Sequence, residues 1–254
     1  MQNHHRPSAV VAALAVASAV ALSAAFAAPT AHAATIAGSF TSTADEDFDL
    51  TALGTTDWAY WNGDPDVDTI PTNRKFGGTA IGDMDVIGSG AVRGSTSSTL
   101  PQFDFTFTDG TAPTAGSVDD PSGRFSTVLN TTGQGVTFDV TLPTADPYTV
   151  SVWAAAFGVN EGTFTASLPG ATNFVNTDLS SGQFSPKSGA LYTLTVTPDN
   201  PGDVLTVSLV LTEDGGSSSS NVSLHAAAVS VVPEPATLGS ALLGLGMLAG
   251  RRRR

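Results

Sequence analysis

The sequence predicts an all-β protein built as an antiparallel β-sandwich or jelly roll. Apolar and polar residues alternate over short runs in the middle of the chain, as in Val136-Thr-Phe-Asp-Val-Thr-Leu142, and this is the period of a strand with one buried face. Turn-forming sequences such as Pro169-Gly170 separate the runs. No window of ten or more residues inside this region has a helical period. About ten short strands without helices favour a sandwich or jelly roll.

The strand pattern is clearest in eight places. They are residues 103–108, 125–129, 136–142, 148–157, 162–168, 191–197, 205–211 and 222–231. The run Gly-Gly-Ser-Ser-Ser-Ser at 215–220 predicts a hairpin tip between the last two strands.

Residues 1–33 have the pattern of a secretory signal peptide. His4, His5 and Arg6 form a basic start, residues 9–28 are apolar, and Ala31-His32-Ala33 is an A-x-A cleavage site. We therefore expect signal peptidase to cut between Ala33 and Ala34. An uncleaved membrane anchor is the alternative.

The last 22 residues combine three features in a fixed order. Pro233-Glu234-Pro235 is followed by an apolar run at 236–250 and then by Arg251, Arg252, Arg253 and Arg254. The run predicts a short transmembrane helix of about 22 Å, less than the ~30 Å of a hydrocarbon core. The arginines would stay on the cytoplasmic side of the inner membrane. The two prolines keep the triplet extended, so the helix begins after Pro235.

This tail resembles the PEP-CTERM sorting signal of Gram-negative bacteria. The resemblance implies processing near Pro233-Glu234-Pro235 by an exosortase, a membrane enzyme that releases or re-anchors its substrate. It divides the chain into a signal peptide at 1–33, a β-sandwich domain at 34–232 and a sorting signal at 233–254. A plain C-terminal membrane anchor is the alternative.

The predicted domain is strongly acidic. Its 199 residues contain five basic and 22 acidic side chains, a net charge of −17. Such a surface repels nucleic acid, which binds proteins through Lys and Arg, whereas divalent cations and neutral glycans remain suitable partners. The chain has no cysteine, which excludes disulfides and cysteine-ligated metals.

Several strand sequences resemble a second family. Asp57-Trp58-x-x-Trp61, Phe105-Thr-Phe107-Thr-Asp109-Gly110 and Tyr148-Thr-Val-Ser-Val152 are similar to β-sandwich modules of bacterial secreted and surface proteins of the galactose-binding type. Such modules often accompany carbohydrate-active enzymes. The resemblance implies the fold and no particular ligand.

Two groups of residues could bind a ligand. Trp58, Tyr60 and Trp61 could stack on sugar rings if they are exposed, although they could equally be core residues. Asp64, Asp66 and Asp68 offer oxygen ligands at alternate positions, compatible with a calcium loop, although a solvated acidic loop is the simpler interpretation. We expect the adjacent Arg74 and Lys75 to clamp the acidic loops.

Catalytic residues are hard to find. His225 is the one histidine left after signal cleavage, and we expect it to be a solvated strand residue. A Ser-His-Asp catalytic triad would depend on this histidine. For ice binding, we identify no regular Thr-x-Thr ladder of the kind that a flat ice-binding face needs. We expect no cofactor other than Ca²⁺.

The sequence therefore predicts an exported, C-terminally sorted protein of the cell surface or extracellular matrix, with a non-catalytic β-sandwich that could bind glycan, such as exopolysaccharide, or mediate adhesion. The predicted partners are signal peptidase, an exosortase-type enzyme and, transiently, the inner membrane. The alternative is a secreted carbohydrate-active enzyme that uses two carboxylates.

Overall fold

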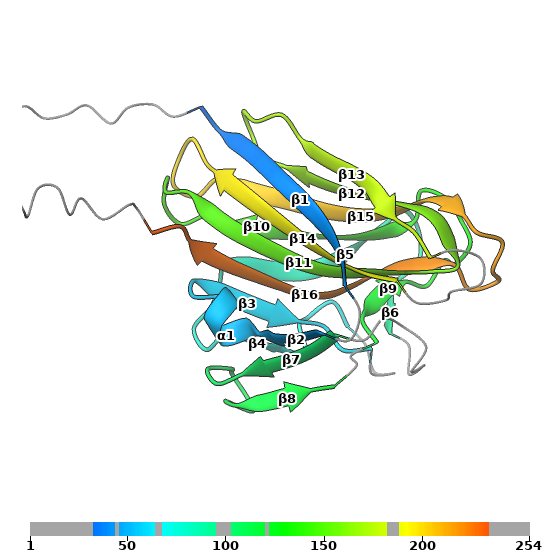
Figure 1. Cartoon of the computed structure of the whole chain (residues 1–254), viewed down its shortest axis with the longest axis horizontal. Helices are drawn as coiled ribbons and strands as arrows, with labels where there is room; N and C mark the ends of the chain where they lie inside the picture. The colour runs from blue at the N-terminus through cyan, green and yellow to red at the C-terminus, as the bar shows by residue number, and fades with distance from the viewer. Residues whose placement is uncertain are drawn as a thin grey trace, which may run out of the picture. The chain divides into compact units, whose positions relative to one another are not determined.

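The computed structural model describes residues 33–43, 46–63, 68–94, 103–119, 122–181 and 188–233. The chain divides into two units, Met1–Ala31 and His32–Arg254, and all described residues lie in the second. These residues form strands and one helical turn, as the alternation of apolar and polar residues predicts (Figure 1).

The largest sheet has eight strands. Its main path is, in order, β1 (Thr35–Thr43), β14 (Ser188–Thr197), β11 (Tyr148–Phe157), β16 (Asn221–Val231), β3 (Asp57–Tyr60) and β4 (Asn73–Arg74), while β9 (Arg124–Ser126) pairs with β16 and with β6 (Val92–Gly94). All of its pairings are antiparallel.

A five-stranded antiparallel sheet packs on one face of the eight-stranded sheet. Its order is β13 (Phe174–Leu179), β12 (Val159–Ser167), β15 (Val204–Asp214), β10 (Gly135–Thr141) and β5 (Ile81–Ile87). Apolar side chains of both sheets interdigitate in a sandwich core that includes Phe138, Phe164 and Tyr192. Phe164 and Tyr192 stack across it with ring centroids 3.9 Å apart. The predicted antiparallel β-sandwich is confirmed.

A third layer covers part of the opposite face of the eight-stranded sheet (Figure 1). It consists of β2 (Glu46–Asp49), β7 (Phe103–Phe107), β8 (Gly116–Val118) and the one-turn helix α1 (Leu50–Leu53). Phe103, Phe105 and Phe107 pack on Trp58 and Trp153 to form a second core. The sequence did not predict this layer.

The two cores explain the burial of the central strands. β11 and β16 are buried along almost their whole length, because one face of each contacts the sandwich core and the other contacts the third layer. β10 and β15 alternate between buried and more exposed residues, because their outer faces are solvated.

Both ends of the folded domain lie at the same end of the eight-stranded sheet. The register places Ile36 of β1 opposite Val196, Val196 opposite Tyr148, and Tyr148 opposite Val231 at the end of β16. Neighbouring strands are about 4.8 Å apart, so three steps separate Ile36 from Val231 by roughly 14 Å. We call this part of the molecule, with the turns that border it, the tethered end.

Candidate functional site

The three aromatic residues proposed for sugar stacking are buried. Trp58, Tyr60 and Trp61 are 0%, 6% and 0% exposed. Successive side chains of a strand point to opposite faces, and both faces of β3 are covered: Trp58 and Tyr60 lie in the second core and Trp61 lies in the sandwich core. The prediction of a stacking platform is therefore wrong, and the alternative interpretation as core residues is confirmed.

Trp58 is also part of a polar network at the edge of the second core. Its Nε1 and the Thr51 hydroxyl each donate to Asp109 Oδ1 across 2.7 Å, while Lys75 Nζ pairs with Asp109 Oδ2. Partial burial alone would raise the pKa of Asp109, but the hydrogen bonds from Lys75, Thr51 and Trp58 outweigh it and lower the pKa. This carboxylate ties α1 and the third layer to β3.

An arginine that was not among the predicted site residues holds the segments on both sides of residues 64–67. Arg124, 5% exposed on β9, donates to the carbonyls of Asn62, Asp68 and Ile70 and to the Thr72 hydroxyl. Its Nη1 also lies 3.6 Å from Asp68 Oδ1. The planar fork of five donors suits arginine to this task.

Of the three predicted calcium ligands, one, Asp68, is among the described residues. Asp68 is exposed, and its Oδ1 accepts a hydrogen bond from the N–H of Ile70 across 2.9 Å. Asp64 and Asp66 lie outside the described residues. Among the residues that are described, no three acidic or histidine side chains are arranged to hold a metal ion.

Arg74 and Lys75 pair with carboxylates other than the expected ones. Arg74 Nη2 lies 3.1 Å from Asp83 Oδ1 on β5, and Lys75 pairs with Asp109. Neither side chain forms an ion pair with Asp68, the one described acid of that loop. Asp64 and Asp66 lie outside the described residues, so for them the expected clamp stays a prediction.

His225 is buried, so the prediction of a solvated histidine is wrong. The ring packs edge-on against Phe103 with centroids 5.0 Å apart, and Nε2 is 3.1 Å from the Ser223 hydroxyl. The ladder between β11 and β16 shifts register at this point, which places His225 and Ala226 on the face that the third layer covers. Gly123 lies against the ring so closely that a Cβ there would be 2.5 Å from Nε2.

Asp57 is the one acidic side chain that is fully buried in the described part of the chain. Its two oxygens accept the N–H groups of Trp58 at 2.8 Å and Ile81 at 2.9 Å, which joins β3 to the start of β5. Burial raises its pKa, and the backbone hydrogen bonds only partly offset this effect. A Cβ at residue 78 would lie 1.9 Å from Oδ1, so Gly78 seals the carboxylate from solvent. This geometry gives Asp57 a structural role.

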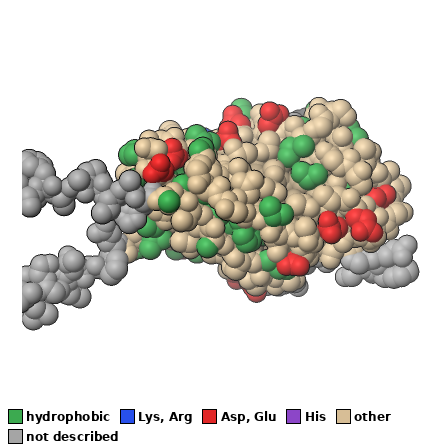
Figure 2. Space-filling model, turned by 90° about the horizontal axis from the view of Figure 1, so that it is seen from above, with side chains coloured by type: hydrophobic (Ala, Val, Ile, Leu, Met, Phe, Trp, Pro, Cys, Tyr) green, Lys and Arg blue, Asp and Glu red, His purple; other side chains and the backbone are tan. Residues whose placement is uncertain are grey.

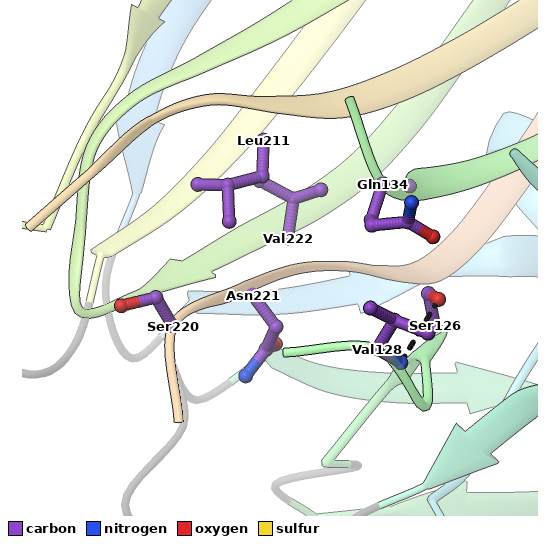
Figure 3. A pocket seen from close by; sticks show the side chains of 8 residues that line it. Ser126, Val128, Gln134, Leu211, Ser220, Asn221 and Val222 are labelled. Atoms are coloured by element: carbon purple, nitrogen blue, oxygen red, sulfur yellow. Dashed lines mark hydrogen bonds between the residues drawn. The ribbon is translucent and has the colours of Figure 1, made fainter. Parts of the chain in front are cut away.

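A small cavity lies where β9 and β10 meet β15 and β16 (Figure 3). Its inner volume is about 10 Å³, room for one water molecule. Asn221 Oδ1, which lines the cavity, is buried and accepts no hydrogen bond from the described residues. A sugar needs a site of roughly 300 Å³ or more, so this cavity suits a structural water.

Among the described residues, the part of the eight-stranded sheet that the third layer leaves uncovered presents uncharged side chains, and we call this surface the hydroxyl face. Its members are Thr35, Ala37, Ser39 and Thr41 of β1, Thr193, Thr195 and Thr197 of β14, Thr149 of β11, and Ser230 of β16. The intervening residues of these strands, such as Leu194 and Val150, point into the sandwich core.

The hydroxyl face is ordered in rows. One row pairs Ala37, Thr195, Thr149 and Ser230 across four strands, and the next pairs Ser39 with Thr193 and ends at the buried Ser151. Neighbours are about 4.8 Å apart across strands and about 6.8 Å apart along them. This Thr-x-Thr ladder was not predicted although residues 193–197 contain it, because the strand register is needed to align the threonines of neighbouring strands. Elsewhere on the surface, carboxylates form separate groups (Figure 2).

Two hydrogen bonds hold the end of β16 to the rest of the domain. The Val232 N–H donates to the carbonyl of Pro147 across 2.8 Å, and the Ser230 hydroxyl donates to the carbonyl of Leu53 across 2.6 Å. Pro233, exposed, is the last described residue. Glu234, Pro235 and the four arginines lie outside the described residues, as does Ala31; Ala33 is exposed and Ala34 is buried. No helix in the described part of the chain is long and apolar enough to span a membrane.

Comparison with protein families confirms the predicted tail. Residues 231–254 match the PEP-CTERM protein-sorting motif. This motif marks exported proteins that are sorted to the cell surface, and it implies processing by an exosortase. Comparison with curated protein sequences gives no match.

Two solved structures share a limited likeness with this chain. One is the enzymatically active domain of tailspike protein 4 of bacteriophage CBA120, with a TM-score of 0.33 and 8% identity over 61% of this chain and 20% of that chain. The other is CBM35 from Cellvibrio japonicus Abf62, with a TM-score of 0.30 and 14% identity over 43% of this chain and 77% of that chain. This chain thus spans a fifth of the tailspike chain.

Proposed function

We propose that this protein is a non-catalytic, exported surface protein that an exosortase-type enzyme processes at its tail and that contacts exopolysaccharide through the hydroxyl face. The observation that carries the proposal is the sorting motif at 231–254, which follows directly on the last strand of a closed β domain. Signal peptidase would remove residues 1–33, and the domain would be displayed at the outer surface or in the extracellular matrix.

The hydroxyl face is the surface that best suits a neutral polysaccharide. Its side chains donate and accept hydrogen bonds, as sugar hydroxyls do. It carries no charge in a domain whose net charge is −17, so a neutral polymer can approach it without removing water from an ion. Methyl groups of the threonines add apolar contact area.

Fractionation of the native host tests the sorting part of the proposal. A chain that lacks residues 233–254 should be exported and folded but should leave the surface fraction. An unchanged distribution between fractions would contradict a sorting role for the tail.

Cosedimentation with polysaccharide from the native host tests the binding part. Thr195→Lys places a charge in the centre of the hydroxyl face and should reduce the sedimented fraction several-fold. Thr141→Lys is the matched control, because Thr141 is an exposed threonine at the end of β10 in the other sheet. Equal binding by both variants would contradict the assignment of this face.

A further inference from the structure

The tethered end concentrates exposed apolar side chains. Five large apolar residues are markedly exposed in the described part of the chain, and three of them, Leu53, Phe76 and Val231, lie at this end. Their exposed fractions are 40%, 77% and 38%. The other two are Ile70 and Val175.

Hydrogen bonds link helix α1, which ends at Leu53, to the segments that carry Val231 and Phe76. The carbonyl of Leu53 accepts from the hydroxyl of Ser230, the neighbour of Val231. On the other side of the helix, Thr51 donates to Asp109, whose carbonyl accepts the N–H of Phe76 across 2.7 Å. These contacts place Leu53, Phe76 and Val231 at the tethered end, beside the exit of the tail, with Leu53 on the Ser230 side of β16 and Val231 on the opposite side.

The connection to the tail is too short to hold the tethered end away from a membrane. Four residue steps lead from Val232, which is bonded to the domain, to Ala236 at the start of the apolar run. An extended chain spans about 3.5 Å per residue, or roughly 14 Å in all. The headgroup layer takes up about 5–8 Å of this distance.

We propose that the tethered end is a lipid-docking surface, and that Leu53, Phe76 and Val231 enter the headgroup region while residues 236–250 are in the bilayer. This inference rests on the proposed membrane insertion of the tail. Exposed aromatic and aliphatic side chains are the usual interfacial anchors of membrane-bound domains. Docking holds the strands upright on the membrane and presents Pro233-Glu234-Pro235 at a constant height above the bilayer.

The charges at this end determine the lipid preference. Asp146, Asp199 and Asp203 lie in the turns that flank β11 and β14 beside Val231, and the two nearest cations, Arg74 and Lys75, are paired with carboxylates. The surface therefore favours zwitterionic over anionic lipid.

Site-specific fluorescence on the full chain tests this proposal. Because the chain has no cysteine, Phe76→Cys, Leu53→Cys and the control Ile70→Cys each provide a single position for an environment-sensitive dye. Ile70 is 52% exposed and lies in the loop that follows the other end of β3. A dye at Leu243→Cys reports separately whether the apolar run is inserted. Emission of the buried tryptophans confirms that each labelled chain is folded.

Vesicles of phosphatidylcholine and phosphatidylethanolamine should shift the emission of the dyes at 53 and 76 to the blue and protect them several-fold from aqueous iodide. The dye at 70 should stay accessible, and added phosphatidylglycerol should reduce the protection. Phe76→Asp should lower the protection at 53, whereas Ile70→Asp should not.

The outcomes distinguish failure of lipid docking by the tethered end from failure of membrane insertion by the tail. A protected dye at 243 with equally accessible dyes at 53, 70 and 76 would overturn docking and leave tail insertion intact. An accessible dye at 243 would overturn both the insertion of the tail and the docking that rests on it.

Discussion

The N–H of Val232 donates a hydrogen bond to the carbonyl of Pro147 across 2.8 Å, so the chain stays attached to the domain up to the residue before the sorting triplet. Processing at the triplet, as proposed, would therefore take place directly beside a folded surface. The short junction links the position of the domain to the processing of the tail.

Lengthening this junction should make the processing of the tail independent of the position of the domain. A flexible Gly/Ser segment inserted between Val232 and Pro233 should leave the stability of the domain unchanged, since the β16 ladder ends at Val231. Processing should be at least as fast as in the natural chain, because the enzyme no longer has to approach the domain. Pulse-chase labelling in the host measures the rate, and clearly slower processing would show that the enzyme needs the domain close to the triplet.

Trp58 should matter for stability. Trp58→Ala removes a fully buried side chain from the second core and should cost about 3–5 kcal/mol. Trp58→Phe keeps most of the apolar contact but loses the hydrogen bond to Asp109, and should cost about 1–3 kcal/mol. Urea denaturation measures both, with Ile70→Ala as an exposed control that should change stability by less than about 0.5 kcal/mol. A Trp58→Ala variant as stable as this control would contradict the burial of Trp58.

Asp57 and Asp109 should give opposite pH dependences. The folded pKa of Asp57 is raised above its ordinary value of 3.8, so its stabilising contribution is complete below that pH and is lost as pH rises through the folded pKa. The free energy of unfolding of the natural chain minus that of Asp57→Asn should therefore fall as pH rises above about 4.

The pKa of Asp109 is lowered, so its contribution to stability changes with pH in the opposite direction to that of Asp57. Its contribution is present above pH 3.8 and is lost as pH falls through the folded pKa. The difference between the natural chain and Asp109→Asn should therefore rise with pH over the acid range. Urea titrations from about pH 3 to 7 measure both differences, and slopes of the same sign would contradict the two assignments.

Calcium should stabilise the domain if Asp64, Asp66 and Asp68 form a site. For a dissociation constant of about 0.1–1 mM, typical of extracellular modules, 10 mM Ca²⁺ adds roughly 1.4–2.7 kcal/mol. Thermal melts with Ca²⁺ or with a chelator measure the shift, which Asp66→Asn should abolish. Identical melting temperatures in the two buffers would contradict a calcium site and support the simpler interpretation of a solvated acidic loop.

Local patterns were sufficient to predict part of the fold. β11 was predicted with its observed bounds, and β10 and β15 were placed to within one to three residues at each end, because each has an uninterrupted apolar period. β1 and β5 were missed because glycines interrupt their alternation at Gly38 and Gly82. The sorting motif was readable because it is contiguous in the sequence.

The third layer could not be predicted from local sequence patterns. It depends on β2 and β7 pairing in parallel across a long connection, and no local pattern reports such a contact. Without that layer, Trp58 and His225 would face solvent, which is why His225 was predicted to be solvated and the burial of Trp58 was left open. The hydroxyl face likewise depends on the register of four strands and not on any one of them.

The most direct test of the account is the mass of the mature protein isolated from its native host, with the natural triplet and with Pro233, Glu234 and Pro235 all changed to alanine. The natural chain should have lost residues 1–33 and the arginine tail, and the variant should keep the tail. Identical C-termini in the two proteins would contradict the claim that this triplet directs the processing and display of the β domain.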